Sequence, residues 1–474
     1  MNKYFLMAGL FALGVTAYAQ TKDGGITEQT VRQIQQVQKP QQRALFNALA
    51  SNKIDDLARS FDSKRQLDTY FSVETPKQSI TDQKQSGRCW MFSGLNVLRA
   101  NFAQRKDSTW GFVPADSKVN LEFSQDYLFF WDQLEKANLF LQGVIDHADK
   151  ALDDTRVQFF FKSPINDGGT FCGVADLADK YGFVPREAMP ETYSAENTSR
   201  MASIMKTVLR QQGLQLRDMV AAKKSKKEIQ NAKTNMLAEV YRMLALNLGE
   251  PLKEFTYAFK DKDGKSLCPA KTYTPMSFFK EVVGEKINGT FIMVMNDPRR
   301  PYHQTYEVEY DRHTYDGHNW KYLNLPMDEI EQLAIAALKD DHKMYSSYDV
   351  GKQLDRQRGY CALDNFDYAS LFDTRFTMDK AQRIATFDSG STHAMTLTAV
   401  DLDEQGKPVK WKVENSWGTA SGQQGCLIMT GEWFREYMFR LVVDKKYVSA
   451  DLLRQYEQKP IMVMPEDPLF QMDE

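Results

Sequence analysis

Residues 83–96 read QKQSGRCWMFSGLN, a polar, glycine-containing loop that changes to a helical pattern at Trp90. Cys89 therefore stands at the expected start of a helix. The unpaired first-turn N–H groups and the helix dipole favour a thiolate there, and the thiolate is the reactive form of cysteine. The side-chain amide of Gln83 is close enough along the loop to donate a hydrogen bond to an oxyanion formed at Cys89. A lone cysteine in an apolar helix can instead be a small buried hydrophobe, so a nucleophile at Cys89 requires a base elsewhere.

A histidine and an asparagine in the last third of the chain provide a base and a group to orient it. His393 lies at the entry to an apolar strand predicted over residues 394–402, and Asn415 follows a second strand predicted over 410–413. If these strands are adjacent and antiparallel, His393 and Asn415 lie side by side. His393 would then take the proton of Cys89, Asn415 would hold the imidazole ring, and Trp417 would cover their hydrogen bond from water.

A pair of glycines precedes another predicted helix. Gly168 and Gly169 come directly before the helical pattern of residues 172–181. Two glycines at that place form a simple turn. They can also leave bare backbone against which a peptide substrate lies and hydrogen-bonds as an added strand.

Composition excludes several classes of protein. The chain has 474 residues, of which 42% are hydrophobic and 12% aromatic, so it can build a large core. Its net charge of −3 provides no general attraction to nucleic acid or anionic membranes. The lysine-rich run at residues 223–227 is typical of a solvated helix face. His313 and His318 are close in sequence, but no acidic or cysteine cluster completes a metal site, so no metal is expected.

The N-terminus has the pattern of an export signal. Lys3 precedes an apolar segment over residues 4–15, and Ala17-Tyr18-Ala19 matches a cleavage site. The alternative is an uncleaved anchor, for which the apolar run is short. We expect cleavage after Ala19 and a periplasmic or secreted chain with no membrane segment after cleavage.

The cysteines are scattered and odd in number. No C-x-x-C pair occurs among the five, so a zinc ribbon or a redox motif is not indicated. In an exported chain an odd number indicates a free thiol, for which Cys89 is the candidate. The other four allow no, one or two disulfides: Cys172, Cys268, Cys361 and Cys426.

Cys-Trp after a glutamine-bearing loop, then His, then Asn-Ser-Trp-Gly, resembles the papain-like cysteine peptidases. The usual C-G-[SA]-C-[WY] signature is not matched, because Ser86-Gly87-Arg88 precedes the cysteine. Papain-type enzymes place the histidine and asparagine ~130–150 residues after the cysteine. Here both lie more than twice as far away, which leaves room for an inserted domain.

With these two departures, the sequence resembles one branch of the papain-like peptidases, the bleomycin hydrolase / aminopeptidase C family. The strings that carry this resemblance extend over nearly the whole chain after the signal segment. They are DQKQSGRCWMF (82–92), LFFW (128–131), YGFVP (181–185), MPET (189–192), NDP (296–298), DVGK (349–352), THAM (392–395), VENSWG (413–418) and DKK (444–446).

The resemblance implies an α+β, papain-like two-lobed fold, in which a helical lobe and an antiparallel β lobe are separated by a large, mostly helical insertion. The expected boundaries are a signal peptide (1–19), an N-terminal arm (20–75), the helical lobe with the catalytic cysteine (76–198), the insertion (199–348), the β-rich lobe with the catalytic histidine and asparagine (349–458) and a C-terminal tail into the active-site cleft (459–474).

The family further implies a thiol aminopeptidase of broad specificity that acts on peptides, without a cofactor, commonly as a homo-hexameric ring. Matched to this sequence, Cys89 is the nucleophile, His393 the base, Asn415 the orienting group and Gln83 the oxyanion donor. Gly168, Gly169 and Trp417 are expected to contact substrate.

The end of the chain leaves the type of peptidase open. In the family the terminal carboxylate binds the amino group of the substrate, a role that falls to Glu474. The last six residues here are bulkier and more acidic than expected, so an endopeptidase remains an alternative. A nucleic-acid-binding ring protein is a remote alternative, which the net charge and the export signal oppose.

Overall fold

The computed structural model describes residues 24–37, 42–65, 68–103, 119–284 and 286–470. The chain divides into two compact units, residues 1–58 and residues 59–474. The described part of the first unit contains the helices α1 (Glu28–Val37), α2 (Arg43–Ser51) and α3 (Ile54–Ala58). The expected signal segment lies outside the described residues. In the described part of the chain, no helix is long and apolar enough to cross a membrane.

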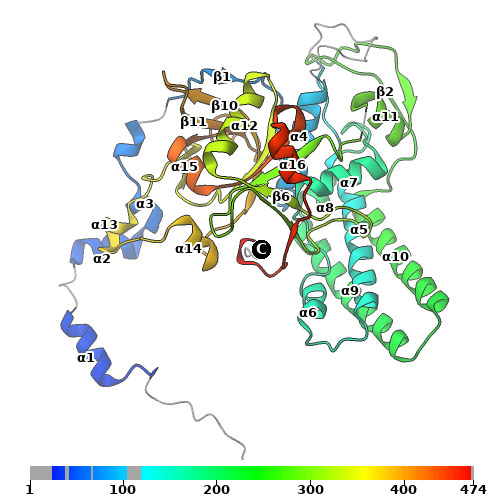
Figure 1. The fold of residues 1–474 in the computed structure, drawn as a ribbon, viewed down its shortest axis with the longest axis horizontal. Helices are drawn as coiled ribbons and strands as arrows, with labels where there is room; N and C mark the ends of the chain where they lie inside the picture. The colour runs from blue at the N-terminus through cyan, green and yellow to red at the C-terminus, as the bar shows by residue number, and fades with distance from the viewer. Residues whose placement is uncertain (1–23, 38–41, 66–67, 104–118, 285, 471–474) are drawn as a thin grey trace, which may run out of the picture. The chain divides into compact units, whose positions relative to one another are not determined.

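One large sheet organises the second unit (Figure 1). Its strands follow the order β14-β5-β6-β4-β13-β7-β10-β11-β12-β9-β8, and β1 also pairs with β10. Their bounds are β1 (Val73–Glu74), β4 (Phe291–Met295), β5 (Gln304–Val308), β6 (Lys321–Asn324), β7 (Met344–Tyr348), β8 (Leu354–Asp355), β9 (Tyr360–Cys361), β10 (His393–Leu402), β11 (Pro408–Glu414), β12 (Cys426–Thr430), β13 (Met438–Asp444) and β14 (Ile461–Val463). A small second sheet pairs β2 (Phe255–Tyr257) with β3 (Lys271–Tyr273).

The sheet takes strands from both sides of the boundary expected at residue 348. Strands β4 to β7 come from residues 291–348, which the sequence assigned to the insertion. Every residue of β4 and of β7 is buried. They lie in the interior of the sheet, where both faces of a strand are covered by other parts of the protein. A strand in that position is typically buried along its whole length.

Helices occupy the stretch between the first cysteine and the sheet: α4 (Cys89–Ala103), α5 (Gln125–Asp146), α6 (Thr155–Lys162), α7 (Phe171–Tyr181), α8 (Tyr193–Glu196), α9 (Thr198–Ala221), α10 (Lys226–Leu248) and α11 (Pro275–Val282). Figure 1 shows α5, α9 and α10 packed side by side. Helices also follow the sheet strands: α12 (Met327–Lys339), α13 (Tyr368–Phe372), α14 (Lys380–Ala385), α15 (Gly431–Tyr437) and α16 (Ala450–Tyr456). Short 3-10 turns are η2 (Asp62–Arg65), η3 (Lys445–Tyr447) and η4 (Pro468–Phe470).

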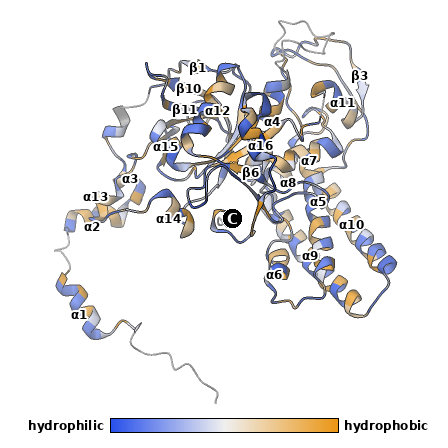
Figure 2. Cartoon of the chain, in the orientation of Figure 1, coloured by the Kyte–Doolittle hydropathy of each residue, from blue (hydrophilic) through white to orange (hydrophobic). Residues whose placement is uncertain are grey.

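The long helical region predicted over residues 199–248 is a hairpin of two helices. Lys223 has a positive φ of 54° and ends the first helix. Ser225 and Glu228 form a capping box that starts the second, so the helical pattern restarts after a short turn. The lysine-rich run spans this turn and the first residues of the second helix, and it is exposed, as predicted. Both helices carry hydrophilic and hydrophobic residues, as expected of helices with one face on the core (Figure 2).

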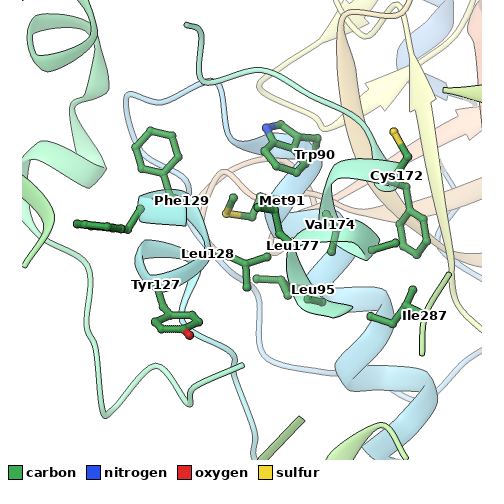
Figure 3. Packing of buried hydrophobic residues seen from close by; sticks show 14 of the residues in the cluster. Trp90, Met91, Leu95, Tyr127, Leu128, Phe129, Cys172, Val174, Leu177 and Ile287 are labelled. Atoms are coloured by element: carbon green, nitrogen blue, oxygen red, sulfur yellow. The ribbon is translucent and has the colours of Figure 1, made fainter. Parts of the chain in front are cut away.

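The start of α4 lies in the core. Trp90, Met91 and Leu95 are buried against residues of α5 and α7, among them Leu128 and Leu177 (Figure 3). This packing fixes the axis of α4 and with it the position of Cys89. A second apolar cluster, formed by sheet strands with α12, α15 and α16, lies elsewhere in the same unit.

The strands that carry the predicted base and orienting group are neighbours. β10 and β11 pair antiparallel, with Thr396 opposite Glu414 and Leu397 opposite Val413. Their predicted pairing is confirmed. The first strand begins one residue earlier than predicted, at His393, and the second extends beyond the predicted residues 410–413 at both ends, so Asn415 directly follows it.

Candidate active site

Cys89 is the first residue of α4 and is held between a helix and the sheet. The backbone N–H of Ala394 lies 3.5 Å from Cys89 Sγ, which joins the helix to β10. Trp90 donates its indole N–H to the carbonyl of Asp167 at 2.8 Å. Asp167 in turn accepts from the N–H of Gly87 at 2.7 Å. The loop before the cysteine and the loop before α7 therefore hold each other in place.

Burial disfavours charge on both Cys89 and His393. It raises the pKa of the Cys89 thiol to about 11, although the N–H groups of Ala394 and Trp90 act in the opposite direction. Burial also lowers the pKa of His393 to about 4, although the hydrogen bond to Asn415 Oδ1 acts in the opposite direction. The helix start alone, from which the sequence predicted a thiolate, does not offset burial. The Cys89 thiolate and the His393 imidazolium can therefore form only together, since each charge then stabilises the other.

His393 is oriented by its neighbours on the second strand and the loop after it. Its Nε2 lies 2.8 Å from Oδ1 of Asn415, so Nδ1 is the ring nitrogen left for a proton from the cleft. Asn415 Oδ1 also accepts from the N–H of Ser416 at 2.8 Å. The Trp417 ring lies 4.9 Å from the His393 ring, centroid to centroid. The structure therefore brings together the three residues that the sequence placed side by side.

Gln83 is fixed next to the same loop. Its N–H donates to Ser416 O at 2.8 Å, and its Oε1 accepts from the Ser416 hydroxyl at 2.6 Å. Its Nε2 donates one hydrogen to the carbonyl of Ser86 at 2.6 Å. A side-chain amide has two N–H donors, so one remains for the cleft that Gln83 lines with Cys89.

The two glycines border that cleft and differ in how much space surrounds them. A Cβ on Gly169 would lie 2.1 Å from His313 Cε1 and 2.9 Å from the Trp90 ring, whereas one on Gly168 would meet nothing closer than 3.7 Å. Lys136 donates to the carbonyl of Gly168 at 2.6 Å. The glycine segment is thus held by His313, Trp90 and Lys136, and it also lines the cleft.

The cleft has a volume of about 830 Å³ and three kinds of wall. The first is the Cys89 loop with the glycine segment. The second is the sheet, through β7, β10 and β13. The third is one side of α9. The residues that line it are Gln83, Gln85, Ser86, Gly87, Cys89, Asn166, Asp167, Gly168, Gly169, Thr198, Ser199, Ala202, Ser203, Lys206, Thr207, Arg210, Tyr345, Ser347, Ser391, Thr392, His393, Ala394 and Arg440. Trp417, which the sequence predicted to contact substrate, packs against the His393 ring and is not among the described residues that line the cleft.

Comparison with known proteins places the chain in a family. The model of the Peptidase C1-like family matches residues 25–470. The chain belongs to this family. It is 39% identical to an aminopeptidase C from Lactobacillus delbrueckii subsp. lactis over 89% of this chain and 92% of that protein. It is 37% identical to a bleomycin hydrolase from Rattus norvegicus over 82% of this chain and 85% of that protein.

A solved structure shows the same fold. The crystal structure of PepW from Lactobacillus rhamnosis HN001 matches 94% of this chain and 99% of that chain with a TM-score of 0.85 and 37% sequence identity. The chain is therefore a papain-like cysteine peptidase with the α+β fold that the sequence predicted, and it is related to the aminopeptidase C and bleomycin hydrolase proteins.

Arg88, which breaks the general papain signature, has a structural partner in this peptidase. Its guanidinium donates to both carboxylate oxygens of Glu191, at 3.2 Å and 2.6 Å. It lies over the rings of Phe92 and Phe129, at 5.2 Å and 5.0 Å. Because Arg88 precedes Cys89 directly, this buried pair ties the nucleophile loop to the segment that leads into α8 and α9.

The tail can be followed as far as Phe470. β14 pairs parallel with β5, and Asp467 accepts from Arg299 at 2.7 Å and from Arg300. Leu469 is buried, and the Arg440 guanidinium lies 5.6 Å from the centre of the Phe470 ring. Since Arg440 lines the cleft, the described tail ends beside it. Glu474 lies outside the described residues.

All five cysteines are free thiols in this structure, and Cys172 and Cys361 are buried. The alternative of no disulfide, one of the three that the sequence allowed, is therefore the one that the structure has. In the described ranges, no group of three or more His, Cys, Asp or Glu side chains is arranged to hold a metal ion.

The cations of the cleft were not predicted from the sequence. Lys206 and Arg210 come from α9, and Arg440 comes from the middle of β13. On α9 the cleft residues recur at positions 199, 202, 203, 206, 207 and 210, which is one helix face. This polar, small-residue stripe was the available signal, but it has the pattern of a solvated face. No local pattern marks Arg440.

Proposed function

We propose that this peptidase is an aminopeptidase of broad specificity that removes N-terminal residues from peptides through Cys89, His393, Asn415 and Gln83. The observation that carries the proposal is that the Cys89 thiol and the Asn415-bound His393 ring border one cleft, with the Ala394 N–H 3.5 Å from the sulfur. The names of the similar proteins, aminopeptidase C among them, support the exopeptidase assignment.

The first half of the reaction forms a thioester. Nδ1 of His393 takes the thiol proton, because Nε2 is occupied by Asn415. The Cys89 sulfur then attacks the carbonyl carbon of the scissile peptide bond, and the carbonyl electron pair moves to the oxygen. The N–H of Cys89 at the helix start and the second Nε2 hydrogen of Gln83 are the donors for this oxyanion. The proton on His393 passes to the leaving nitrogen as the C–N bond breaks.

The second half returns the enzyme to its starting state. The new N-terminus of the shortened peptide leaves, and a water molecule enters beside His393. Nδ1 takes a proton from this water, whose oxygen attacks the thioester carbon. The C–S bond breaks, the N-terminal amino acid is released, and the sulfur recovers its proton from His393. Asn415 keeps the ring in one orientation during both halves, which is the contribution of the third group in such sites.

Amino-terminal selectivity is proposed to come from the tail. The anchoring of Asp467 and the position of Phe470 beside Arg440 support a tail that approaches one end of the cleft. A tail that closes this end leaves space for a single residue before the scissile bond. The carboxylate of Glu474 is proposed to bind the substrate ammonium.

Turnover of fluorogenic peptides tests the proposal. The chain from Gln20 onward should cleave aminoacyl amides with a free amino group, and Cys89→Ala should abolish this. Cys268→Ala is the matched control, because Cys268 is a free thiol that does not line the cleft. Unchanged turnover in Cys89→Ala would contradict the mechanism.

The specificity of the peptidase is tested separately. Acetylation of the substrate amino group should abolish cleavage by the full chain. Equal cleavage of free and acetylated peptides would show an endopeptidase, which is the alternative that the unusual tail suggests. A chain that ends at Phe470 should gain activity on acetylated peptides if the tail sets the direction.

Location and assembly are further parts of the proposal. The segment of residues 1–19 is proposed to direct export, with cleavage after Ala19, and the peptidase is proposed to act in the periplasm or outside the cell as a homo-hexamer. N-terminal sequencing of the exported protein and light scattering of the purified protein test the two parts. A retained N-terminus at Met1 or a monomer in solution would contradict them.

A further inference from the structure

Arg440 occupies an unusual position in the sheet. It lies on β13 directly opposite Ser347 of β7, and Ser347 lies directly opposite Ala394 of β10. Side chains of directly opposite residues project from the same face of a sheet. All three residues line the cleft, so Arg440 belongs to its floor, two strands away from the residue that contacts Cys89 Sγ. At ~4.8 Å per strand this is about 10 Å.

The Arg440 guanidinium has no anionic partner in the described part of the chain. The residue is only 7% exposed, its Nε is buried without a hydrogen-bond partner, and its neighbours are the rings of Trp320 at 4.9 Å and Phe470 at 5.6 Å. Two other buried arginines have side-chain hydrogen bonds that Arg440 lacks. Arg88 and Arg99 each donate hydrogen bonds through both terminal nitrogens.

A buried cation of this kind is costly unless an anion joins it. Since Arg440 lines the cleft, the cleft is where a partner can reach it. The lining contains only one carboxylate among the described residues, Asp167. Asp167 is already bound by the N–H of Gly87 and the hydroxyl of Thr198. The Arg440 guanidinium is therefore available for an anionic ligand that enters the cleft.

We propose that Arg440 forms a carboxylate-binding subsite in the floor of the cleft and gives this peptidase a preference for peptides with an acidic residue near the scissile bond. The inference rests on the proposed peptidase function and adds a substrate class to it. The same chemistry is present in the chain's own acidic end, since Asp473 and Glu474 follow Phe470 in the sequence. The experiment distinguishes these two sources of the carboxylate.

The test compares substrates that differ in one charge. Fluorogenic peptides carry Glu or Gln, one position at a time, at the three residues around the scissile bond. We expect kcat/KM for Glu to exceed that for Gln by about tenfold at one position, the size of one charge-assisted hydrogen bond. Arg440→Gln should reduce this ratio below about twofold, and Arg440→Lys should retain part of it. Each variant is judged by its Glu-to-Gln ratio, so an effect on turnover that is common to both peptides cancels.

A chain that ends at Phe470 identifies the source of the carboxylate. If the substrate supplies it, the shortened chain keeps the Glu preference. If the chain's own end occupies Arg440, the preference appears only after shortening and disappears again in the shortened Arg440→Gln chain. A Glu-to-Gln ratio that Arg440→Gln leaves unchanged in both chains would overturn the proposal.

Binding separates this proposal from the catalytic one. Labelled Glu and Gln peptides are titrated into Cys89→Ala protein with and without Arg440→Gln, and fluorescence anisotropy is recorded. If the wild-type chain cleaves no peptide, the proposed function fails, but the binding ratio still tests the subsite. Tighter binding of the Glu peptide that requires Arg440 supports it, and equal binding of both peptides by full-length and shortened protein contradicts it.

Discussion

The Arg88–Glu191 pair provides a sharp prediction, because it is buried, bidentate and adjacent to the nucleophile. The substitution Glu191→Gln keeps the shape of the side chain and removes its charge. The side chain of Arg88 is fully buried and that of Glu191 is 4% exposed. Water therefore has little access to replace the lost partner, and Phe92 and Phe129 offer only their ring faces.

The expected loss follows from this burial. Removal of one partner from a buried ion pair costs ~3–5 kcal/mol, because the other charge is left without compensation. Against a total stability of ~5–15 kcal/mol this is a large fraction. Glu191→Gln should therefore lower the urea midpoint strongly, and it should also lower kcat because the loop that holds Cys89 loses an anchor. Unfolding is followed by tryptophan fluorescence, and turnover by release of a fluorogenic amine.

The matched control removes both charges. In Arg88→Met/Glu191→Met no charge is left buried, and apolar replacement of such pairs is often neutral or stabilising. The double variant should therefore be more stable than Glu191→Gln alone. A loss below ~1 kcal/mol in Glu191→Gln, the range of exposed pairs, would refute the view that this pair holds the loop. A double variant less stable than the single one would refute it as well.

Three further predictions concern single side chains. Gly169→Ala should destabilise the fold by ~1–3 kcal/mol in urea, because its Cβ would overlap His313, while Gly168→Ala should change the stability by less than ~0.5 kcal/mol; equal losses would contradict the packing. Gln83→Ala should lower kcat ~10²–10³-fold in a steady-state assay, and a normal kcat would remove Gln83 from the oxyanion site. Asp126 is buried with neither oxygen hydrogen-bonded to a described residue, and burial raises its pKa to about 8. The folded state then holds a proton that the unfolded chain releases above pH ~4, so stability falls from pH ~4 to pH ~8 by at most ~1.4 kcal/mol per unit; Asp126→Asn should flatten this slope in urea titrations at pH 5–8, and an unchanged slope would contradict the assignment.

The sequence predicted the local parts of the site well, because each depends on a short pattern. The strands of His393 and Asn415 are β-rich runs joined by a tight turn, and their adjacency follows from the short connection. The change from a polar loop to an apolar run predicts the helix that begins at Cys89. In these cases the residues that determine the structure are neighbours in the chain.

The parts that the sequence did not predict depend on tertiary contacts. Arg440 is a single cation in a fully packed strand, where period-two alternation is lost because both faces are covered. The partnership of Arg88 with Glu191 joins residues about 100 positions apart, and nothing local links them. The helix dipole was expected to favour a thiolate at Cys89, whereas burial raises the pKa of the thiol. The extent of that burial depends on tertiary packing and cannot be read from the sequence.

Covalent labelling tests the central claim, that Cys89 is the nucleophile and His393 its base. The protein is treated with an aminoacyl diazomethyl ketone, which alkylates an activated thiol, and intact mass, tandem mass spectrometry and residual turnover are measured in parallel. The account predicts one adduct per chain, located on Cys89, with loss of turnover in proportion to labelling and much slower labelling in His393→Ala. Full turnover with Cys89 alkylated, or an adduct on another cysteine that accompanies the loss of activity, would contradict it.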